Sequence, residues 1–375
     1  MTAERVRRLS IVRRHHLGAA HRAASPAEVI ASLGALHSSD PATVYLSIAA
    51  RCPSATLADI DAAVYDGGHL RVLGMRRTMF VVPVADVAAV HASSTRKIAV
   101  RENVRLVKYL ADNELGGADP AGYLSALKSE VLDALRDTDG LTGRELGRLV
   151  PDLQQKITVP GGQQGMTTMV LQRMPMDGTI VRGRPIGTWL SSQYRYSVAP
   201  GPHGIDDPSL SVDEASREVL GGYARRFGPV NRDDHRWWTG WTATQVDRAA
   251  EGLEFVDHVN DSDGELGATP AVAVLPGLDS TIMGWRDRDW YLGELAPALF
   301  DRNGNAGPTL LVDGRVVGGW AQDNAGAVVY RLLEPVSDDA RSLIDAECLR
   351  IEAWLDGAIV TPRFRTPLER ELSGR

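Results

Sequence analysis

Apolar residues recur at helical spacing over the first seventy positions of the chain. Each of three such runs begins after a residue that is favoured as a helix N-cap, and two of the runs begin with proline. The short stretch 37–39 between the first two runs is therefore predicted to be a tight corner between helices. The three predicted helices extend from Pro26 to Leu36, from Asp40 through Ala49, and from Thr56 to a stop at Gly67.

Two short apolar runs follow the third helix and predict a β-hairpin over residues 70–83. Three helices and a hairpin, in this order, are typical of a winged helix, which is a helix-turn-helix unit with an added β-ribbon. Arg76 and Arg77 fall at the connection between the two strands, from which a ribbon reaches a phosphate or a groove. Together with Thr78 and Arg51 they are candidate DNA contacts. The competing interpretation of Arg76 and Arg77, a pair of solvated arginines, has equal weight.

The pattern of helices followed by a strand is repeated further along the chain. Residues 84–135 are predicted to be helical on both sides of a break at Gly116–Gly117. The glycine-rich stretch 159–165 is predicted to be a loop, and it matches no phosphate-binding motif because no Lys-Ser/Thr follows it. The second copy of the pattern consists of a capping box at Thr142 and Glu145, a helix over Met166–Arg173 and a strand over Thr179–Gly183.

A third copy is predicted between residues 212 and 252. Three tryptophans in this copy are expected to fill its core, although stacking on nucleic-acid bases is an alternative use of the same side chains. The expected helices cover residues 214–227, 231–238 and 242–252, and the tryptophans are Trp237, Trp238 and Trp241.

From residue 271 onward, short apolar runs alternate with turn residues and predict a small β-rich domain. Asp313–Gly314 between two of the runs is a strong hairpin signal, Trp290–Leu292 is one of the runs, and a helix over Asp338–Leu355 closes the domain. The predicted fold class is therefore α+β, with tandem winged-helix modules followed by a β-rich C-terminal domain. The predicted domains are 1–110, 111–210, 211–268 and 269–375.

The composition is that of an ordinary globular protein, with 375 residues, 43% apolar and 24% charged. No apolar run is long enough to span a membrane, and Cys52 and Cys348 fit no disulfide framework or metal-ligand spacing, which indicates a reducing cytoplasm. The net charge of −7 is unevenly distributed. Residues 1–110 carry 15 Lys and Arg against 8 Asp and Glu, whereas residues 211–375 carry 17 against 28. A basic N-terminal part in an otherwise acidic chain is the charge distribution expected of a phosphate-binding face.

Four consecutive polar residues, His37, Ser38, Ser39 and Asp40, bring together an imidazole, two hydroxyls and a carboxylate. Taken alone, such a stretch is an ordinary polar turn, because Ser and Asp side chains satisfy nearby backbone groups. The same groups are also able to hold a water and accept its proton, since a histidine with an unperturbed pKa of roughly 6.5 is a base near neutrality. The four residues alone favour an ordinary polar turn, whereas the motifs around them favour a catalytic role.

Five segments of the chain resemble, in the same order, the AlkZ/YcaQ winged-helix DNA glycosylases. The resemblance covers nearly the whole chain, and it implies three tandem winged helices with a C-terminal β-domain. It also implies excision of bulky or crosslinking alkylated purines from DNA, in some members as self-resistance to a DNA-damaging natural product. The segments are the corner before Asp40–Pro41, Met75–Pro83, Tyr223–Val230, Leu275–Asp279 and Val312–Trp320.

The corner departs from the family pattern. The family carries Gln-x-Gln or Gln-x-Asp directly before the Asp-Pro, and this chain has His37 and Ser39 at those positions. We therefore expect His37 to accept the proton of an attacking water and Ser39 to hold that water, with Ser38 and Asp40 in support. Asp40 either orients His37 or caps its helix, and capping is the favoured interpretation.

The resemblance predicts a monofunctional glycosylase. A cationic N7- or N3-alkylpurine is already a good leaving group, and none of the four lysines lies in a matched motif, so no Schiff-base lyase step is expected. We expect no cofactor, no metal and no membrane, a monomeric protein, and duplex DNA containing alkylated purines as partner. The alternative is a non-catalytic winged-helix protein that binds DNA or a lesion. Absence of both glutamines favours this alternative, whereas the remaining motifs favour the enzyme.

Overall fold

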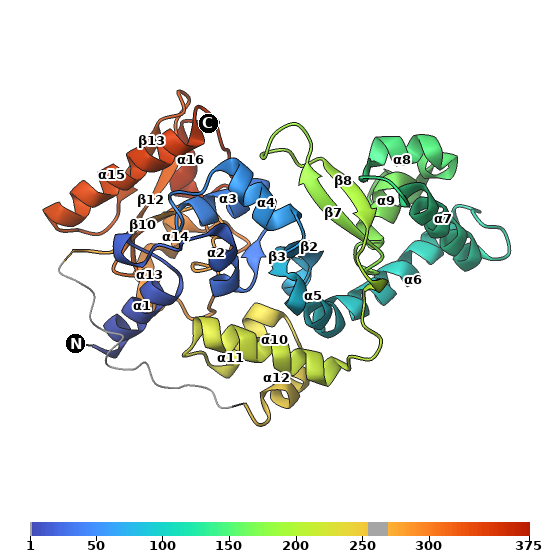
Figure 1. The fold of residues 1–375 in the computed structure, drawn as a ribbon, viewed down its shortest axis with the longest axis horizontal. Coiled ribbons are helices and arrows are strands. Elements are labelled where there is room, and N and C mark those ends of the chain that lie inside the picture. The colour runs from blue at the N-terminus through green and yellow to red at the C-terminus, as the bar shows by residue number, and fades with distance from the viewer. Residues whose placement is uncertain (1, 254–268) are drawn as a thin grey trace. The chain divides into compact units, whose positions relative to one another are not determined.

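The computed structural model describes residues 2–253 and 269–375. The chain forms two compact units, residues 1–68 with 220–375 and residues 69–219, and the second boundary falls within helix α10 (Val212–Phe227). Figure 1 shows the path of the chain through both units. Among the described residues, no helix is both long enough and apolar enough to cross a bilayer.

The first unit begins with four helices, of which the two after the corner confirm the sequence prediction. Helix α3 is capped by Asp40, and helix α4 begins with a capping box between Thr56 and Asp59. Helix α2 ends three residues earlier than predicted, because Gly34 adopts a φ of +68° there. The next residues form the short strand β1. The chain therefore enters the corner from a strand, and the predicted entry from a helix is wrong. These elements are α1 (Ala3–Arg14), α2 (Pro26–Leu33), β1 (Leu36–His37), α3 (Pro41–Ala49) and α4 (Leu57–Tyr65).

A four-stranded antiparallel sheet, in the order β10-β11-β12-β13, forms the C-terminal part of the first unit. The predicted hairpin at Asp313–Gly314 joins β11 to β12, and the predicted helix Asp338–Leu355 is helix α15. The run Trp290–Leu292 is not a strand but part of helix α13, whose N–H groups bond to the Arg288 carbonyl. The elements are β10 (Val272–Leu275), α13 (Asp289–Leu292), α14 (Ala296–Leu299), β11 (Thr309–Val312), β12 (Arg315–Gln322), β13 (Val328–Leu332), α15 (Asp338–Leu355) and α16 (Pro367–Ser373).

Three helices precede this sheet in the chain, and they confirm the helices predicted between residues 212 and 252. After α10 they are α11 (Arg232–Thr239), which is capped by Asn231, and α12 (Ala243–Ala250). Trp238 stacks on Tyr223 with ring centroids 4.4 Å apart, and Trp241 is buried. Trp241 therefore lies in the core as predicted, whereas Trp237 and Trp238 are only partly buried. Residues 254–268 of this predicted module lie outside the described residues.

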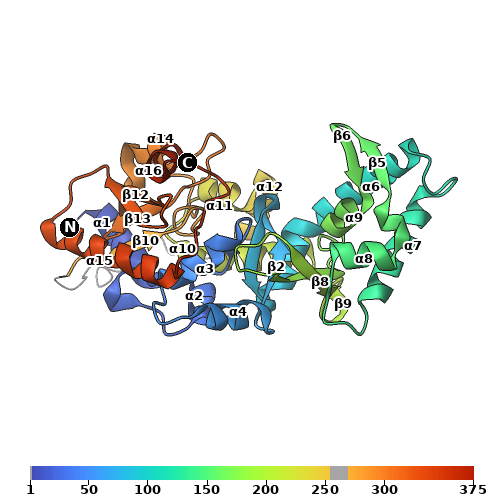
Figure 2. The ribbon, with the colours of Figure 1, turned by 90° about the horizontal axis from the view of Figure 1, so that it is seen from above.

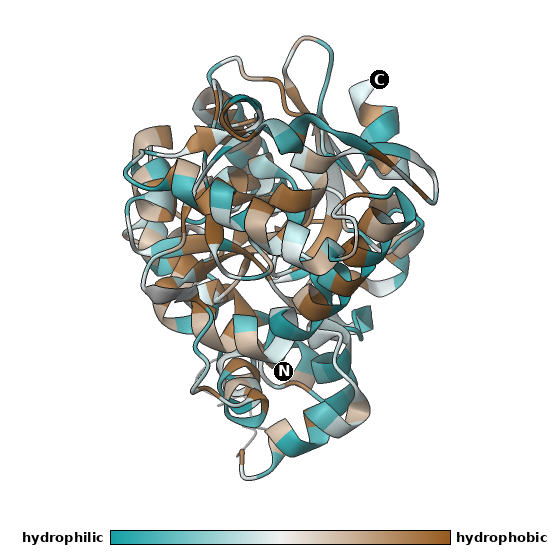
Figure 3. Cartoon of the chain, turned by 90° about the vertical axis from the view of Figure 1, so that its right-hand side faces the viewer, coloured by the Kyte–Doolittle hydropathy of each residue, from teal (hydrophilic) through white to brown (hydrophobic). Residues whose placement is uncertain are grey.

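The second unit begins with the predicted hairpin, in which β2 pairs with β3 from His69 opposite Pro83 to Leu73 opposite Met79. Three helices follow, and the predicted break at Gly116–Gly117 separates the last two, since both glycines have positive φ. In Figure 3, brown hydrophobic and teal hydrophilic segments alternate along the helices, as expected of helices with one buried face. The elements are β2 (His69–Leu73), β3 (Met79–Pro83), α5 (Val84–Val90), α6 (Arg96–Asp112) and α7 (Pro120–Leu135).

The remainder of the second unit contains the predicted helix over Met166–Arg173 and a strand close to the predicted Thr179–Gly183, packed around a hydrophobic core. The stretch 159–165, predicted to be a loop, instead contributes to a hairpin whose strands lie against α6 and α9 (Figure 2). Ile157 and Val159 are buried in this hairpin, which explains why it forms. The elements are β4 (Leu141–Thr142), α8 (Gly143–Leu149), β5 (Lys156–Val159), β6 (Gly162–Gly165), α9 (Met166–Arg173), β7 (Ile180–Pro185), β8 (Tyr194–Val198) and β9 (Pro202–Ile205).

Strands β4, β8 and β7 form one antiparallel sheet in that order, and the hairpin β5-β6 lies between α8 and α9 in the chain. That these elements form a winged helix stays a prediction. The two compact units meet at residues 68 and 219 of the chain. Division of the chain into four modules stays a prediction.

Candidate functional site

The corner singled out in the sequence lies in the first unit, between β1 and α3. Burial alternates along it: Leu36 and Ser38 are buried, whereas His37 and Ser39 are partly exposed. Side chains two positions apart lie on the same side of an extended backbone. His37 and Ser39 are therefore brought to the exposed side of the corner, and Ser38 faces the protein interior.

Asp40 ends the corner and caps α3. One oxygen, Oδ1, accepts the Ala42 N–H at 3.1 Å, and the other, Oδ2, accepts the Arg363 N–H at 2.9 Å. Burial raises the pKa of Asp40 above its usual range, and these two N–H groups act in the opposite direction. The capping role that the sequence favoured for Asp40 is confirmed by this geometry.

The C-terminal segment 358–364 holds the corner from a second side. The Arg363 guanidinium donates from Nη1 to the Ser39 carbonyl at 3.0 Å, in addition to the backbone bond to Asp40. Three residues earlier in the chain, the Val360 N–H donates to Gln322 Oε1 at 2.7 Å, and Gln322 Nε2 donates to the Ala358 carbonyl at 3.0 Å. The segment therefore connects the corner to Gln322, the last residue of strand β12.

A small cavity of about 20 Å³ lies behind Asp40, which is room for about one water molecule. Its walls come from α3, the loop after β10, β12 and the C-terminal segment, and they are mostly apolar. This cavity is too small to hold a purine. The residues that line it are Asp40, Ala42, Thr43, Leu46, Pro276, Gly277, Pro308, Trp320, Ala321, Gln322, Val360 and Pro362.

Arg51 is not a DNA contact, contrary to the sequence prediction, because its side chain is 0% exposed. Its guanidinium pairs with Asp279 through two bonds, from Nη2 to Oδ1 at 2.7 Å and from Nη1 to Oδ2 at 2.8 Å. Its other N–H groups bond to the carbonyls of His15 and Ser47 and to the Thr281 hydroxyl, at 2.8 to 2.9 Å. All five guanidinium protons therefore have protein partners.

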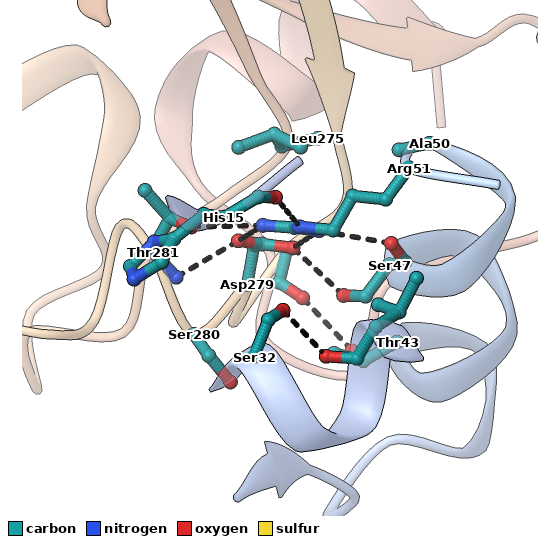
Figure 4. Close-up of polar contacts among 12 residues, drawn as sticks. His15, Ser32, Thr43, Ser47, Ala50, Arg51, Leu275, Asp279, Ser280 and Thr281 are labelled. Atoms are coloured by element: carbon teal, nitrogen blue, oxygen red, sulfur yellow. Dashed lines mark hydrogen bonds and ion pairs between the residues drawn. The ribbon is translucent and has the colours of Figure 1, made fainter. Parts of the chain in front are cut away.

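This buried pair joins the end of helix α3 to the loop after β10 (Figure 4). Ser47 on α3 also donates to Asp279 Oδ2 at 2.8 Å. Burial acts to raise the pKa of Asp279, but the charge of Arg51 and these hydrogen bonds outweigh it and hold that pKa below its usual range. The helix that follows the corner is therefore anchored at its far end by a charged network.

His15 completes the network on the side away from Asp279. Its Nδ1 lies 2.8 Å from the Thr281 hydroxyl, and its Nε2 lies 3.1 Å from the Arg226 carbonyl. Because that carbonyl only accepts, Nε2 carries the proton and Nδ1 accepts from Thr281. Burial, and next the charge of Arg51, hold the pKa of His15 well below its ordinary value. The imidazole is therefore neutral in the folded protein.

The other predicted DNA contacts lie in the second unit, in the turn between β2 and β3. Arg76 and Arg77 are exposed there with positive φ of 54° and 60°, and Thr78 closes the turn through its N–H bond to the Met75 carbonyl at 3.0 Å. The Arg77 guanidinium also pairs with Glu102 on α6. The structure places both arginines at the connection between the strands, and their contact with DNA stays a prediction.

A wide groove in the second unit runs between helices α8 and α9 and strands β7 and β8. Arg144 and Arg182 line it together with Gln172 and Tyr194. Among the described residues, no cluster of His, Cys, Asp and Glu side chains is arranged to hold a metal ion. The groove therefore offers hydrogen-bond donors and aromatic faces as its recognition groups.

Sequence analysis missed two residues that position the corner. Asp279 ends one of the segments that resemble the family, and it is a single charged residue that follows an apolar run, which is a signal for a buried ion pair. Arg363 carried no such signal, because it lies 323 positions from the Asp40 that it contacts. Only the folded chain shows that contact.

Three comparisons with known proteins complete the description. A family model described as "DNA glycosylase AlkZ-like" matches residues 30–354. The fold is similar to that of the Streptomyces sahachiroi DNA glycosylase AlkZ, with a TM-score of 0.68 over 94% of this chain and 97% of that chain, at 17% sequence identity. No curated protein matches the sequence significantly. Because the family model spans most of its length, the chain belongs to the AlkZ-like DNA glycosylase family.

Proposed function

We propose that this protein is a monofunctional DNA glycosylase that hydrolyses the N-glycosidic bond of bulky N7- or N3-alkylated purines in duplex DNA. Support comes from family membership over residues 30–354 and from the place of the corner in the fold. The observation that carries the proposal is the position of His37 and Ser39, side by side on the exposed side of the corner and directly before the cap of α3.

In the proposed reaction, the oxygen of a water attacks C1′ of the deoxyribose. The bond from C1′ to the purine nitrogen breaks, and its electron pair neutralises the positive charge of the alkylated ring. His37 accepts the proton of the water, and the Ser39 hydroxyl orients that water. The alkyl group has already made the purine a good leaving group, so the corner needs no strong acid. We propose no cofactor, and no lyase step because no lysine is assigned to the corner.

Ser38 and Asp40 act through the backbone in this proposal. Asp40 fixes the start of α3 and accepts the Arg363 N–H, and the buried Ser38 keeps its neighbours on the opposite side of the strand. Arg76, Arg77 and Thr78 contact the DNA backbone from the hairpin turn, and the modules of helices and a wing act as winged helices. DNA repair, or self-resistance to an alkylating natural product, is the proposed setting, with the protein acting as a monomer in the cytoplasm.

A second candidate function is a protein that binds alkylated DNA without cleaving it. The specific observation in its favour is that His37 and Ser39 stand where the family carries Gln and either Gln or Asp. An imidazole and a hydroxyl differ from two amides in charge, size and hydrogen bonding, so hydrolysis is not guaranteed by membership of the family.

The test is single-turnover release of base from a duplex with one N7-alkylguanine, measured from pH 5.5 to 8.5 and corrected for spontaneous depurination. If His37 is the base, the rate rises with pH as the imidazole loses its proton and then levels off. His37→Ala is expected to lower the rate on the order of 10²–10⁴-fold with DNA affinity nearly unchanged, and Ser39→Ala by less. If His37→Gln keeps activity but its rate no longer rises with pH, the corner orients the water and does not accept its proton. An unchanged rate in His37→Ala would refute the assigned role.

A further inference from the structure

Glu102 on helix α6 is surrounded by three arginines from three different elements of the second unit. The carboxylate is 12% exposed, and it accepts from Arg77 Nη2 at 2.5 Å, from Arg105 Nη1 at 3.0 Å and from Arg173 Nη2 at 3.5 Å. One negative charge is therefore shared by three guanidinium groups. Among the described ion pairs of this helix, Lys108 with Asp112 is an ordinary one-to-one pair.

The three arginines differ in how many N–H donors they leave available to a further partner. Arg173 is 8% exposed, and it also donates to the carbonyls of Glu102 and Met169, so it belongs to the interior. Arg77 and Arg105 are 57% and 53% exposed. In the described part of the chain, Arg77 uses only Nη2 of its guanidinium on a protein partner, and Arg105 uses only Nη1. Both groups therefore present their remaining N–H donors to solvent.

The two exposed guanidinium groups are also close together. Both donate to the same oxygen of Glu102, Oε1, at 2.5 and 3.0 Å, so their donor nitrogens lie within reach of a single bound anion. Further cations flank them, with Arg76 in the same turn and Arg101 one helical turn before Arg105, both exposed. Forked N–H donors around an excess of positive charge match the geometry of a phosphodiester.

We propose that Arg77 and Arg105 together bind one backbone phosphate of duplex DNA, with Glu102 holding both guanidinium groups in position. This inference rests on the proposed function, because it takes DNA as the partner. It adds helix α6, to which sequence analysis gave no role, to the DNA-binding surface. It also explains why a carboxylate lies within a phosphate site. Glu102 orders two long side chains before the DNA arrives, and its single negative charge offsets only one of the three arginine charges around it, so a net positive charge remains to attract phosphate.

The experiment measures how the affinity for an unmodified duplex depends on salt, by fluorescence anisotropy from 50 to 200 mM NaCl. Losing one phosphate contact lowers the slope of log K against log[salt] by about 0.9, so the salt-induced loss of affinity shrinks by roughly 3.5-fold over this range. Because the proposal assigns one phosphate to both residues, Arg77→Gln, Arg105→Gln and the double variant are all expected to show nearly this same decrease. The matched control is Arg136→Gln, which removes an arginine that is 68% exposed and paired one-to-one with Asp133.

A slope unchanged in the double variant, or lowered equally by Arg136→Gln, would overturn the proposal. A decrease near 1.8 in the double variant, with 0.9 in each single variant, would overturn the shared site and assign two separate contacts. Arg77→Lys with Arg105→Lys keeps both charges and is the second variant if the glutamines disturb folding; it is expected to keep the slope with weaker binding. Inorganic phosphate at constant ionic strength should not displace the duplex from wild type, and displacement at millimolar levels would assign the site to free phosphate. Base release is not measured in any of these arms, so the outcome is separate from that of the proposed function.

Discussion

Asp279→Ala should be among the most destabilising single substitutions in the first unit. The variant removes the partner of the fully buried Arg51 and with it two of five guanidinium hydrogen bonds. Breaking a buried ion pair by removing one partner typically costs about 3–5 kcal/mol, because the remaining charge is left without compensation. The Ser47 hydroxyl and the Thr281 N–H lose an acceptor as well, which places the expected value in the upper half of that range.

Urea unfolding followed by tryptophan fluorescence measures this loss, since Trp285 is buried in the same unit. With a slope of about 3 kcal/mol per molar urea, the midpoint should fall by about 1 to 2 M. Glu371→Ala is the matched control in the same unit. It removes one partner of the exposed pair between Arg331 and Glu371, with side chains 49% and 60% exposed, and should change stability by about 0–1 kcal/mol.

The double variant Arg51→Met with Asp279→Leu tests the assigned cause. Removing both charges should recover part of the loss, because no unpaired charge remains in the interior. Recovery should be incomplete, since the carbonyls of His15 and Ser47 then lack their donor. A midpoint for Asp279→Ala within 0.3 M of wild type would refute the argument, and so would a double variant less stable than both single variants combined.

Two further outcomes follow from the same geometry. Arg363→Ala keeps the backbone bond to Asp40 but removes the guanidinium from the Ser39 carbonyl, so single-turnover excision at saturating DNA should fall roughly tenfold, with partial rescue by Arg363→Lys; equal rates would remove Arg363 from the site. The folded protein resists protonation of His15, whereas the unfolded chain binds that proton near pH 6.5, so stability should fall as pH drops below about 6.5. His235, whose pKa is lowered to about 4 by burial, acts in the same direction, and a urea midpoint constant from pH 7.5 to 5 would contradict both assignments.

Most of the predicted helices follow from local signals in the sequence. The caps at Asp40 and Thr56 and the helices over 231–238 and Asp338–Leu355 follow from residues within a few positions of each other, and the structure confirms them. The prediction failed where a glycine or the tertiary environment decides the outcome. Gly34 ended helix α2 early, and burial of Ile157 turned a glycine-rich stretch into a hairpin.

The site was predictable in part, for a related reason. The four polar residues of the corner are adjacent in sequence, and the capping role of Asp40 follows from local chemistry. Arg51, by contrast, was named as a candidate DNA contact, although its side chain is buried. Its actual partner, Asp279, lies 228 positions away, so the local signal at Asp279 does not identify Arg51 as the residue with which it pairs.

Release of free N7-alkylguanine by the wild-type protein tests the central claim most directly. A duplex with one bulky N7-alkylguanine is incubated with excess protein, and the free base and the abasic strand are quantified against an unmodified duplex and a no-protein control. We predict one free base and one abasic site per lesion, above spontaneous depurination, with no strand cleavage until alkali is added. Tight binding of the alkylated duplex without release of base, at any pH from 5.5 to 8.5, would contradict the enzyme and leave the lesion-binding function in its place.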